Sequence, residues 1–160
     1  GIVKRDLGDS PVRITGTVAD ARALIEAGAD IVAYDATSRP RTDGREDILA
    51  AILDGGAIAM ADCATEADAR EALSAGAAVI GTTLSGYTAE TATDDDGPDF
   101  ALLRRFRSLG GFVMAEGRFN TPDLAAEAMR AGADAVTVGS ALTRLEIMTD
   151  WFAEAVRSAR

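Results

Sequence analysis

Histidine is absent from the sequence, and cysteine occurs only once, as Cys63. Without histidine the chain lacks the most common general base and the most common zinc ligand. A lone cysteine cannot form an internal disulfide, which indicates a reducing compartment and favours the cytoplasm. Any acid–base chemistry therefore has to come from Lys, Asp, Glu, Tyr or Cys side chains.

Long apolar stretches and positive charge are also scarce. No apolar run approaches the roughly 20 residues that cross a bilayer. The 26 acidic side chains outnumber the 16 basic ones, and the formal charge is −10. This charge disfavours nucleic acid and anionic membranes as partners. An anionic ligand would need a local positive site that overcomes the overall field.

Small residues are abundant, and they recur in a loose internal repeat. The segments "ALIEAGADIVAYDA", "EALSAGAAVIGTT" and "EAMRAGADAVTVGSA" each read as a helix end, an Ala-Gly stop and a short apolar strand. Gly28, Gly76 and Gly132 suit the left-handed conformation that ends a helix. The 160 residues are enough for one domain with a hydrophobic core.

The periodicity predicts strands near residues 1–4, 30–35, 57–62, 77–82, 111–116 and 134–139. It predicts helices near 17–27, 43–54, 65–75, 98–108, 121–131 and 145–159, with Thr65 and Thr121 as N-caps. Alternation of this kind indicates parallel strands joined by right-handed crossovers. The polar stretch 84–98 is interpreted as a functional loop, or as an ordinary mobile one.

Ionisable residues fall at the C-terminal ends of four predicted strands: Lys4, Asp35, Asp62 and Glu116. Each follows an apolar residue on the same strand face. Because ligands of parallel α/β folds bind beyond these strand ends, we expect one site with a lysine and three carboxylates. Any single strand-end Asp could instead be a helix cap or loop anchor. Cys63 falls on the opposite face, where we expect it to pack against a helix.

Two further groups of residues suit a phosphorylated, polyhydroxy ligand. Gly117, Gly139 and Ser140 follow the last two strands, where barrel enzymes commonly bind phosphate on backbone N–H groups. Arg144 could add a bidentate contact. The hydroxyls after the fourth strand belong to Thr82, Thr83, Ser85 and Tyr87. The alternatives are that the glycines only make tight turns and that the hydroxyls belong to an ordinary polar loop.

Several segments together resemble one known family. "GIVKRD", "SPVRIT", "AGADIVAYDAT", "MADCAT", "GTTLSGYT", "AEGRFNTP" and "AVTVGSALTR" are similar to N-acylglucosamine-6-phosphate 2-epimerases, over the whole chain. The resemblance implies a (β/α)8 TIM barrel. It also implies interconversion of N-acetylmannosamine 6-phosphate and N-acetylglucosamine 6-phosphate, in sialic acid and amino sugar catabolism.

The resemblance also implies roles for individual residues. Lys4 would be the catalytic acid/base, and Glu116 a second catalytic residue. Asp62 and Arg144 would contact the substrate. From their places after the strands, we also expect Asp35, Thr82 and Thr83 to be substrate contacts. The expected phosphate contacts are Gly117, Arg118, Gly139 and Ser140. No metal or other cofactor is implied, and a homodimer is expected from the family alone.

Epimerisation at C2 fits these side chains chemically. Opening the sugar ring makes the C2 proton acidic, because it then lies next to a carbonyl. Lysine can act as the base only when part of it is neutral, which needs burial or neighbouring positive charge. The alternatives are another sugar-phosphate isomerase or lyase, such as a metal-dependent 3-epimerase, and an inactive fragment or sugar-phosphate sensor.

Only six strand–helix units can be counted, whereas a closed barrel of this class has eight. We therefore expect residues 1–160 to form a single TIM-barrel domain that lacks its first two βα units. The strands would form an open arc, with strand 1–4 at one edge and strand 134–139 at the other.

Overall fold

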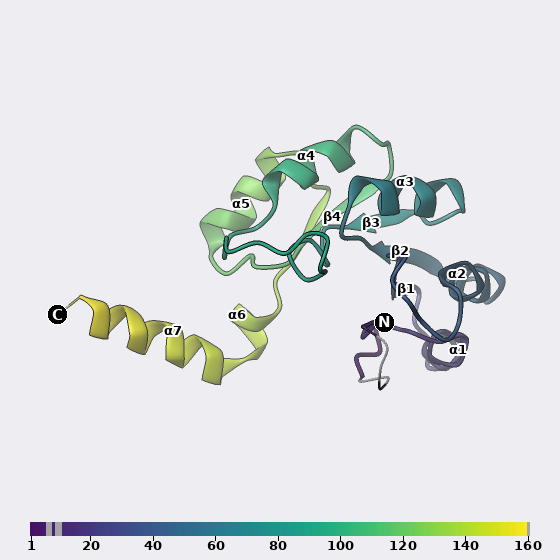
Figure 1. Cartoon of the computed structure of the whole chain (residues 1–160), viewed down its shortest axis with the longest axis horizontal. Coiled ribbons are helices and arrows are strands. Elements are labelled where there is room, and N and C mark those ends of the chain that lie inside the picture. Colours follow the sequence, from purple (N-terminus) through teal and green to yellow (C-terminus); the bar gives the residue numbers. More distant parts are fainter. Residues whose placement is uncertain (6–7, 9–10, 160) are drawn as a thin grey trace.

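The computed structural model describes residues 1–5, 8 and 11–159. Its strands are β1 (Ile31–Asp35), β2 (Ile58–Asp62), β3 (Val79–Gly81), β4 (Phe112–Glu116) and β5 (Ala135–Thr137). They form one parallel sheet in the order β1-β2-β3-β4-β5, so each strand pairs with the next along the chain. Among the described residues the sheet is open, with β1 and β5 at its edges (Figure 1). This arrangement confirms the predicted α/β class.

Helices alternate with the strands, close to the predicted ranges. They are α1 (Val18–Glu26), α2 (Arg45–Asp54), α3 (Glu66–Ser74), α4 (Phe100–Arg107), α5 (Pro122–Arg130), α6 (Ser140–Thr143) and α7 (Leu145–Ser158). Thr65 and Thr121 cap α3 and α5 as predicted. Gly28, Gly76 and Gly132 take positive φ after three of the helices, also as predicted. The one-turn helix α6 is an addition to the predicted set.

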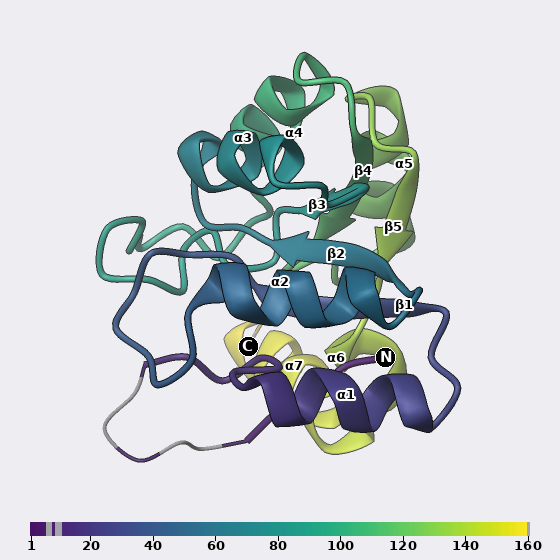
Figure 2. The ribbon, with the colours of Figure 1, turned by 90° about the vertical axis from the view of Figure 1, so that its right-hand side faces the viewer.

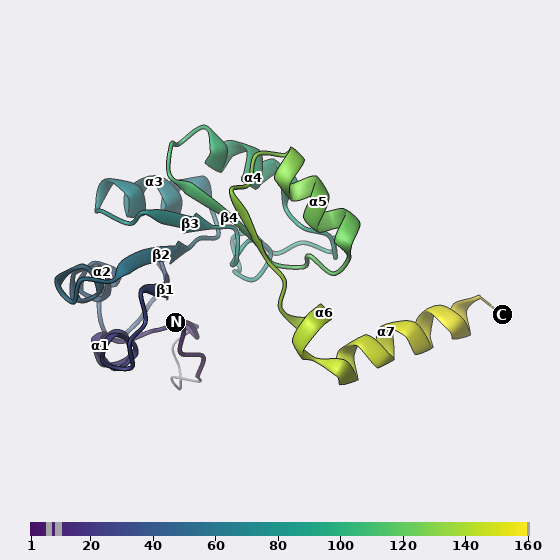
Figure 3. The ribbon, with the colours of Figure 1, turned by 180° about the vertical axis from the view of Figure 1, so that it is seen from behind.

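Alternation along the strands separates two faces of the sheet. One set of strand residues, including Val32, Ala59 and Val113, is fully buried in the main apolar core. Helices α1 to α5 follow this side of the curved sheet (Figures 1 and 3). Cys63 lies in the same core, as predicted, and burial raises the pKa of its thiol well above the ordinary value. The opposite face is therefore left for the ionisable strand ends.

The predicted strand 1–4 is wrong. Among residues 1–4, it is Gly1 that bonds with β1, and Ala33 N–H donates to the Gly1 carbonyl over 2.9 Å. Beyond it, Lys4 forms an isolated antiparallel bridge with Ile14, and the Ile14 carbonyl accepts from Asp35 N–H over 3.2 Å. The chain has turned back, so the Ile14 segment takes the place beside the end of β1. Lys4 still lies next to the sheet, but not on a strand.

Helix α7 is arranged differently from the other helices. It extends away from the sheet (Figures 1 and 3), and none of its residues is buried. Figure 2 views the molecule from the side, with α1 and α2 toward the reader. The described helices include none that is long and apolar enough to span a membrane.

Candidate functional site

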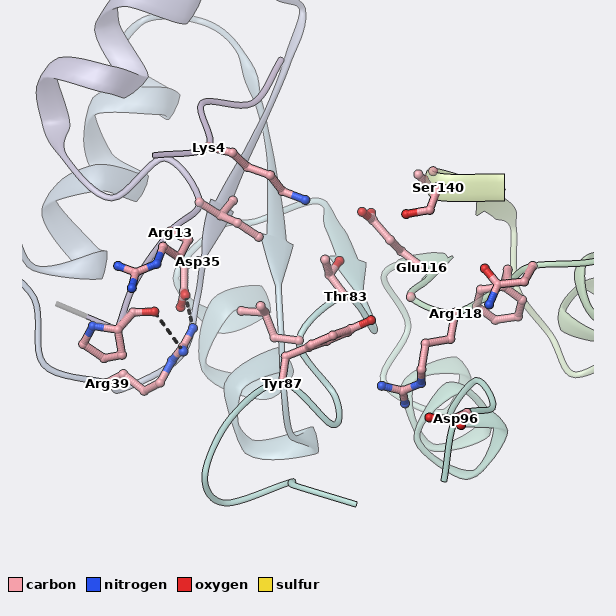
Figure 4. A pocket seen from close by; sticks show the side chains of 18 of the residues that line it. Lys4, Arg13, Asp35, Arg39, Thr83, Tyr87, Asp96, Glu116, Arg118 and Ser140 are labelled. Atoms are coloured by element: carbon pink, nitrogen blue, oxygen red, sulfur yellow. Dashed lines mark hydrogen bonds and ion pairs between the residues drawn. The ribbon is translucent and has the colours of Figure 1, made fainter. Parts of the chain in front are cut away.

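A cavity of about 950 Å³ lies at the C-terminal ends of the strands. Figure 4 shows the side chains that line it, which come from segments far apart in the sequence. Its lining includes most of the predicted site: Lys4, Asp35, Thr83, Glu116, Gly117, Arg118, Gly139 and Ser140. Asp62, Thr82 and Arg144 are not in the lining. The structure thus gathers the predicted residues around one space, and distinguishes those that face it from those that do not.

Lys4 and Glu116 face each other across this space. The amino group of Lys4 points toward the Glu116 carboxyl group (Figure 4). Burial raises the pKa of Glu116, and the Lys4 charge and the Thr83 hydroxyl oppose part of that rise. A carboxyl group with a raised pKa can hold and release a proton nearer to neutral pH. Lys4 itself is exposed, so the described residues do not supply the burial that a lysine base needs.

Thr82 lies behind the cavity wall and is bonded to the backbone of Glu116. Its hydroxyl donates to the Glu116 carbonyl over 2.8 Å and accepts from the Glu116 N–H over 3.1 Å. These bonds continue the pairing of β3 and β4 one residue beyond the end of β3. Thr82 was predicted to bind substrate, but in this structure its hydroxyl is used to hold Glu116.

Asp62 ends β2 and is fully buried beneath the cavity. Its Oδ1 accepts a hydrogen bond of 2.8 Å from the Thr83 hydroxyl, and its Oδ2 has no partner among the described residues. Burial, followed by the charge of Glu116, raises the pKa of Asp62 well above the ordinary carboxyl value. Asp62 thus holds a proton more readily than an exposed carboxyl group does, and it contacts the cavity lining through Thr83.

Asp35 is also fully buried, but its oxygens have many partners. Oδ1 accepts from the Thr37 N–H at 3.0 Å, the Thr37 hydroxyl at 2.6 Å and Arg41 at 3.1 Å, while Oδ2 is paired with Arg39. Asp35 thus organises the loop after β1, which is the loop-anchor role left open above. Sequence analysis missed both arginines. Their spacing at alternate positions after Asp35 is the signal that could have identified them.

The glycines predicted to bind phosphate line the cavity as well. Gly117 has φ +99°, and a Cβ there would lie 3.5 Å from the Thr83 carbonyl oxygen. Gly139 has open space where its Cβ would be. Ser140 begins α6 at the same edge. Arg144 instead forms an ion pair with Glu146 on the exposed surface, so its contact with phosphate stays a prediction.

Other cavity residues had no role in the sequence analysis. Arg13, Ile14 and Arg39 come from the segments that pass the end of β1, and Trp151 comes from α7. Within the part of the chain that the structure describes, no group of three His, Cys, Asp or Glu side chains could hold a metal ion.

Several known proteins similar to this chain belong to one family of enzymes. Residues 1–158 match the family model described as "Putative N-acetylmannosamine-6-phosphate epimerase". A Vibrio vulnificus protein named "Putative N-acetylmannosamine-6-phosphate 2-epimerase" is 54% identical over all of this chain and 70% of its own length. The "Bifunctional enzyme NanE/NanK" of Brucella melitensis is 56% identical, over 99% of this chain and 30% of its own.

A solved structure of the N-acetylmannosamine-6-phosphate 2-epimerase from Clostridium perfringens superimposes with a TM-score of 0.92 at 35% identity. The match covers 97% of this chain and 69% of that one. The chain thus spans about two thirds of the length of these single-function relatives. It belongs to the N-acetylmannosamine-6-phosphate epimerase family, whose members are isomerases with a TIM-barrel fold.

Proposed function

We propose that this protein interconverts N-acetylmannosamine 6-phosphate and N-acetylglucosamine 6-phosphate. The observation that carries the proposal is the placement of Lys4 and Glu116 on opposite sides of one cavity, in a chain of this family. The reaction inverts a single carbon, so it needs a group that removes a proton and a group that can serve the other face. The lone, buried Cys63 supports a reducing compartment, and we assign the reaction to the cytoplasm.

The proton steps follow from the chemistry of the open-chain sugar. Removal of the C2 proton leaves the electron pair in an enolate that is shared by C1, C2 and the carbonyl oxygen. Return of a proton to the opposite face of C2 gives the epimer. Lys4 is the residue we assign to this transfer, and Glu116 assists ring opening or the return of the proton. No oxidant is consumed, because one C–H bond breaks and one forms.

Recognition of the phosphate is assigned to the glycine edge of the cavity. Gly117, Gly139 and Ser140 present backbone there without large side chains. Thr83 is the predicted hydroxyl contact that faces the cavity, whereas Thr82 and Asp62 support the wall from behind. Arg144 would reach the phosphate only from a different side-chain position.

The test is turnover of N-acetylmannosamine 6-phosphate in D2O, followed by NMR. We expect deuterium at C2 of both epimers. Lys4 is the only lysine in the sequence, so Lys4→Ala removes all lysine side-chain chemistry and should lower kcat at least about 100-fold. Arg130→Ala, an exposed cation on α5, should remain at the wild-type rate.

Three outcomes would contradict the proposal. Epimerisation with full retention of the C2 proton would indicate a different mechanism. Normal turnover by Lys4→Ala would remove Lys4 from the reaction. Binding of the sugar phosphate without turnover would favour a sensor. Equal rates on the phosphorylated and unphosphorylated sugars would contradict the assigned phosphate site but not the epimerase activity.

A further inference from the structure

The side chain of Arg118 is committed to the β3–α4 loop (residues 82–99). Its Nε donates to the carbonyl of Gly97 over 2.6 Å, and its Nη1 donates to the carbonyl of Ser85 over 2.9 Å. The guanidinium group therefore joins two points of the loop that are twelve residues apart. Sequence analysis assigned Arg118 to phosphate, and that contact stays a prediction, while Nε and Nη1 donate to this loop.

The backbone around Arg118 is shaped to allow this contact. Arg118 has φ +62°, in the left-handed region that non-glycine residues rarely adopt. The guanidinium lies against Gly86, where any Cβ would collide with Nη1. Arg118, with its strained backbone, thus contacts Gly86 at a point where a side chain would not fit. Such features are common where a site depends on exact placement.

The same guanidinium lies over the ring of Tyr87. The distance from Cζ to the ring centroid is 5.3 Å, within the range of a cation–π contact. Tyr87 lines the main cavity, and 58% of its surface is exposed. In the view of Figure 4 its ring lies between Arg39 and Arg118. An exposed aromatic ring held in this way is a surface onto which a ligand can stack.

Arg118 also forms a boundary between two hollows. It lines the main cavity and a second one of about 640 Å³, which is also lined by residues of the loop. Ser85 is further tied to the N-terminus of α4, because its hydroxyl donates to Asp99 Oδ2 over 2.7 Å. The loop is thereby anchored at its start and near its end, and Tyr87 follows directly after the first anchor.

We infer that Arg118 is a positioning residue that braces the β3–α4 loop, and that Tyr87 is the stacking surface for the sugar. The inference rests on the proposed function, since it takes an amino sugar phosphate as the ligand. The C–H groups of an amino sugar are apolar and suit the face of an aromatic ring. The ring would then determine affinity and leave the proton-transfer groups unchanged.

The brace is tested first, without any ligand. Arg118→Asn removes the guanidinium but keeps a residue that tolerates the left-handed conformation. We expect amide hydrogen exchange across residues 85–97 to accelerate at least tenfold, with exchange of β2 and β4 unchanged. Arg105→Gln, which removes a cation from α4 beside the second cavity, is the matched control and should leave the loop as in the wild type. An unchanged rate of amide hydrogen exchange in the loop of Arg118→Asn would overturn the inference that Arg118 braces it.

The stacking surface is tested by a double-mutant cycle. Tyr87→Ala should raise KM for N-acetylmannosamine 6-phosphate roughly tenfold with kcat within about twofold, whereas Tyr87→Phe should stay near the wild type. Arg118→Asn should raise KM to a similar extent, and Arg118→Lys should restore part of it. Because both changes remove the same ordered ring, the double variant should be no more than about twofold worse than either single one.

Two results would overturn the second half of the inference. An unchanged KM in Tyr87→Ala would show that the ring does not contact the sugar. A double variant in which the two effects multiply would show that the residues act separately. An inactive wild-type protein would contradict the proposed function but not the inference about Arg118 and Tyr87. The cycle would then use calorimetric Kd values for N-acetylglucosamine 6-phosphate, and the exchange experiment would stand unaltered.

Discussion

A single buried hydroxyl positions the candidate catalytic glutamate. Thr82 both donates to and accepts from the backbone of Glu116, and 4% of Thr82 is exposed. Misplacement of a reacting group by about 1 Å can lower a rate about 100-fold, even when the change is remote from the chemistry. The hydroxyl of Thr82 is therefore expected to matter for turnover without touching the substrate.

Thr82→Val should lower kcat about 10- to 100-fold with little change in KM, and Thr82→Ser should restore most of the rate. Steady-state kinetics would measure both constants. Thr149→Val serves as the control, because its hydroxyl also donates to a backbone carbonyl, over 2.8 Å, but on α7. A KM effect without a kcat effect would instead support the original assignment of Thr82 to substrate binding.

Asp62 should make the protein less stable as the pH rises. Its pKa is raised in the folded protein, so the native state binds more protons than the unfolded state between the ordinary carboxyl pKa and the raised one. Unfolding free energy then falls with increasing pH across that window. Asp62→Asn should remove this dependence and be more stable than the wild type by about 1–3 kcal/mol at pH 8. Little difference should remain at pH 4.

Thermal unfolding at pH 4, 6 and 8 would measure the Asp62 effect. Asp54→Asn, at the exposed C-terminal end of α2, is the matched control. A wild-type protein whose Tm relative to Asp62→Asn did not change with pH would contradict a raised pKa at this position.

At the scale of elements, side-chain caps mark the start of helices α1, α3, α4 and α5. Thr65 accepts from Asp68 N–H at the start of α3, and Asp68 Oδ2 accepts from the Thr65 N–H over 2.9 Å in return. Such reciprocal bonds satisfy donors that a helix leaves open at its N-terminus. Asp68 Oδ2 also accepts from the Ala64 N–H over 3.1 Å, so the cap holds the short connection between β2 and α3.

Thr65→Ala should lower the unfolding free energy by about 1 kcal/mol, in the range measured for lost N-caps. Urea unfolding followed by circular dichroism would measure the change. Ser74→Ala lies in the last turn of the same helix, where its hydroxyl donates to the Glu71 carbonyl, and should change stability by less than about 0.5 kcal/mol. Equal losses of unfolding free energy in both variants would show that the N-cap of α3 contributes no more to stability than a hydrogen bond in its last turn.

At the scale of the whole molecule, the main feature is the uncovered apolar surface of the C-terminal segment. Leu142, Leu145, Phe152 and Val156 are each between 59% and 76% exposed. Strand β5 nearby is an edge of the sheet within the described residues, and edges with free backbone groups favour pairing with another chain. Contiguous exposed apolar groups usually mark an interaction surface.

We expect this surface to bind a second copy of the chain, so that the sedimentation coefficient increases with protein concentration. The double variant Phe152→Ser/Val156→Ser should weaken this association at least tenfold, because it removes apolar area that would be buried between copies. Glu154→Ser, on the same helix, should not. A wild-type protein that stayed monomeric at every concentration tested would contradict the expectation.

Much of the architecture is determined by sequence signals that act over short range. N-cap threonines, glycines that accept positive φ, and apolar residues at strand or helix spacing each depend on a few neighbouring residues. They predict every described helix except α6, the five observed strands and the parallel class, together with a strand at 1–4 that did not form. Side chains alternate across a strand, so the same signals place Asp35, Asp62 and Glu116 on the face away from the helices.

The roles of those residues were decided only by the tertiary structure. Whether Asp62 faces the cavity or lies beneath it depends on Thr83, which is 21 residues away. Thr82 holds Glu116 across 34 residues, and Arg118 reaches Ser85 across 33. After Gly1 the chain turns back, and the Ile14 carbonyl, not a carbonyl of residues 2–4, accepts from the Asp35 N–H at the end of β1. A hydrogen bond requires its donor and acceptor to lie within about 3.5 Å of each other. A local sequence pattern does not specify which residues, distant in sequence, the fold will bring that close.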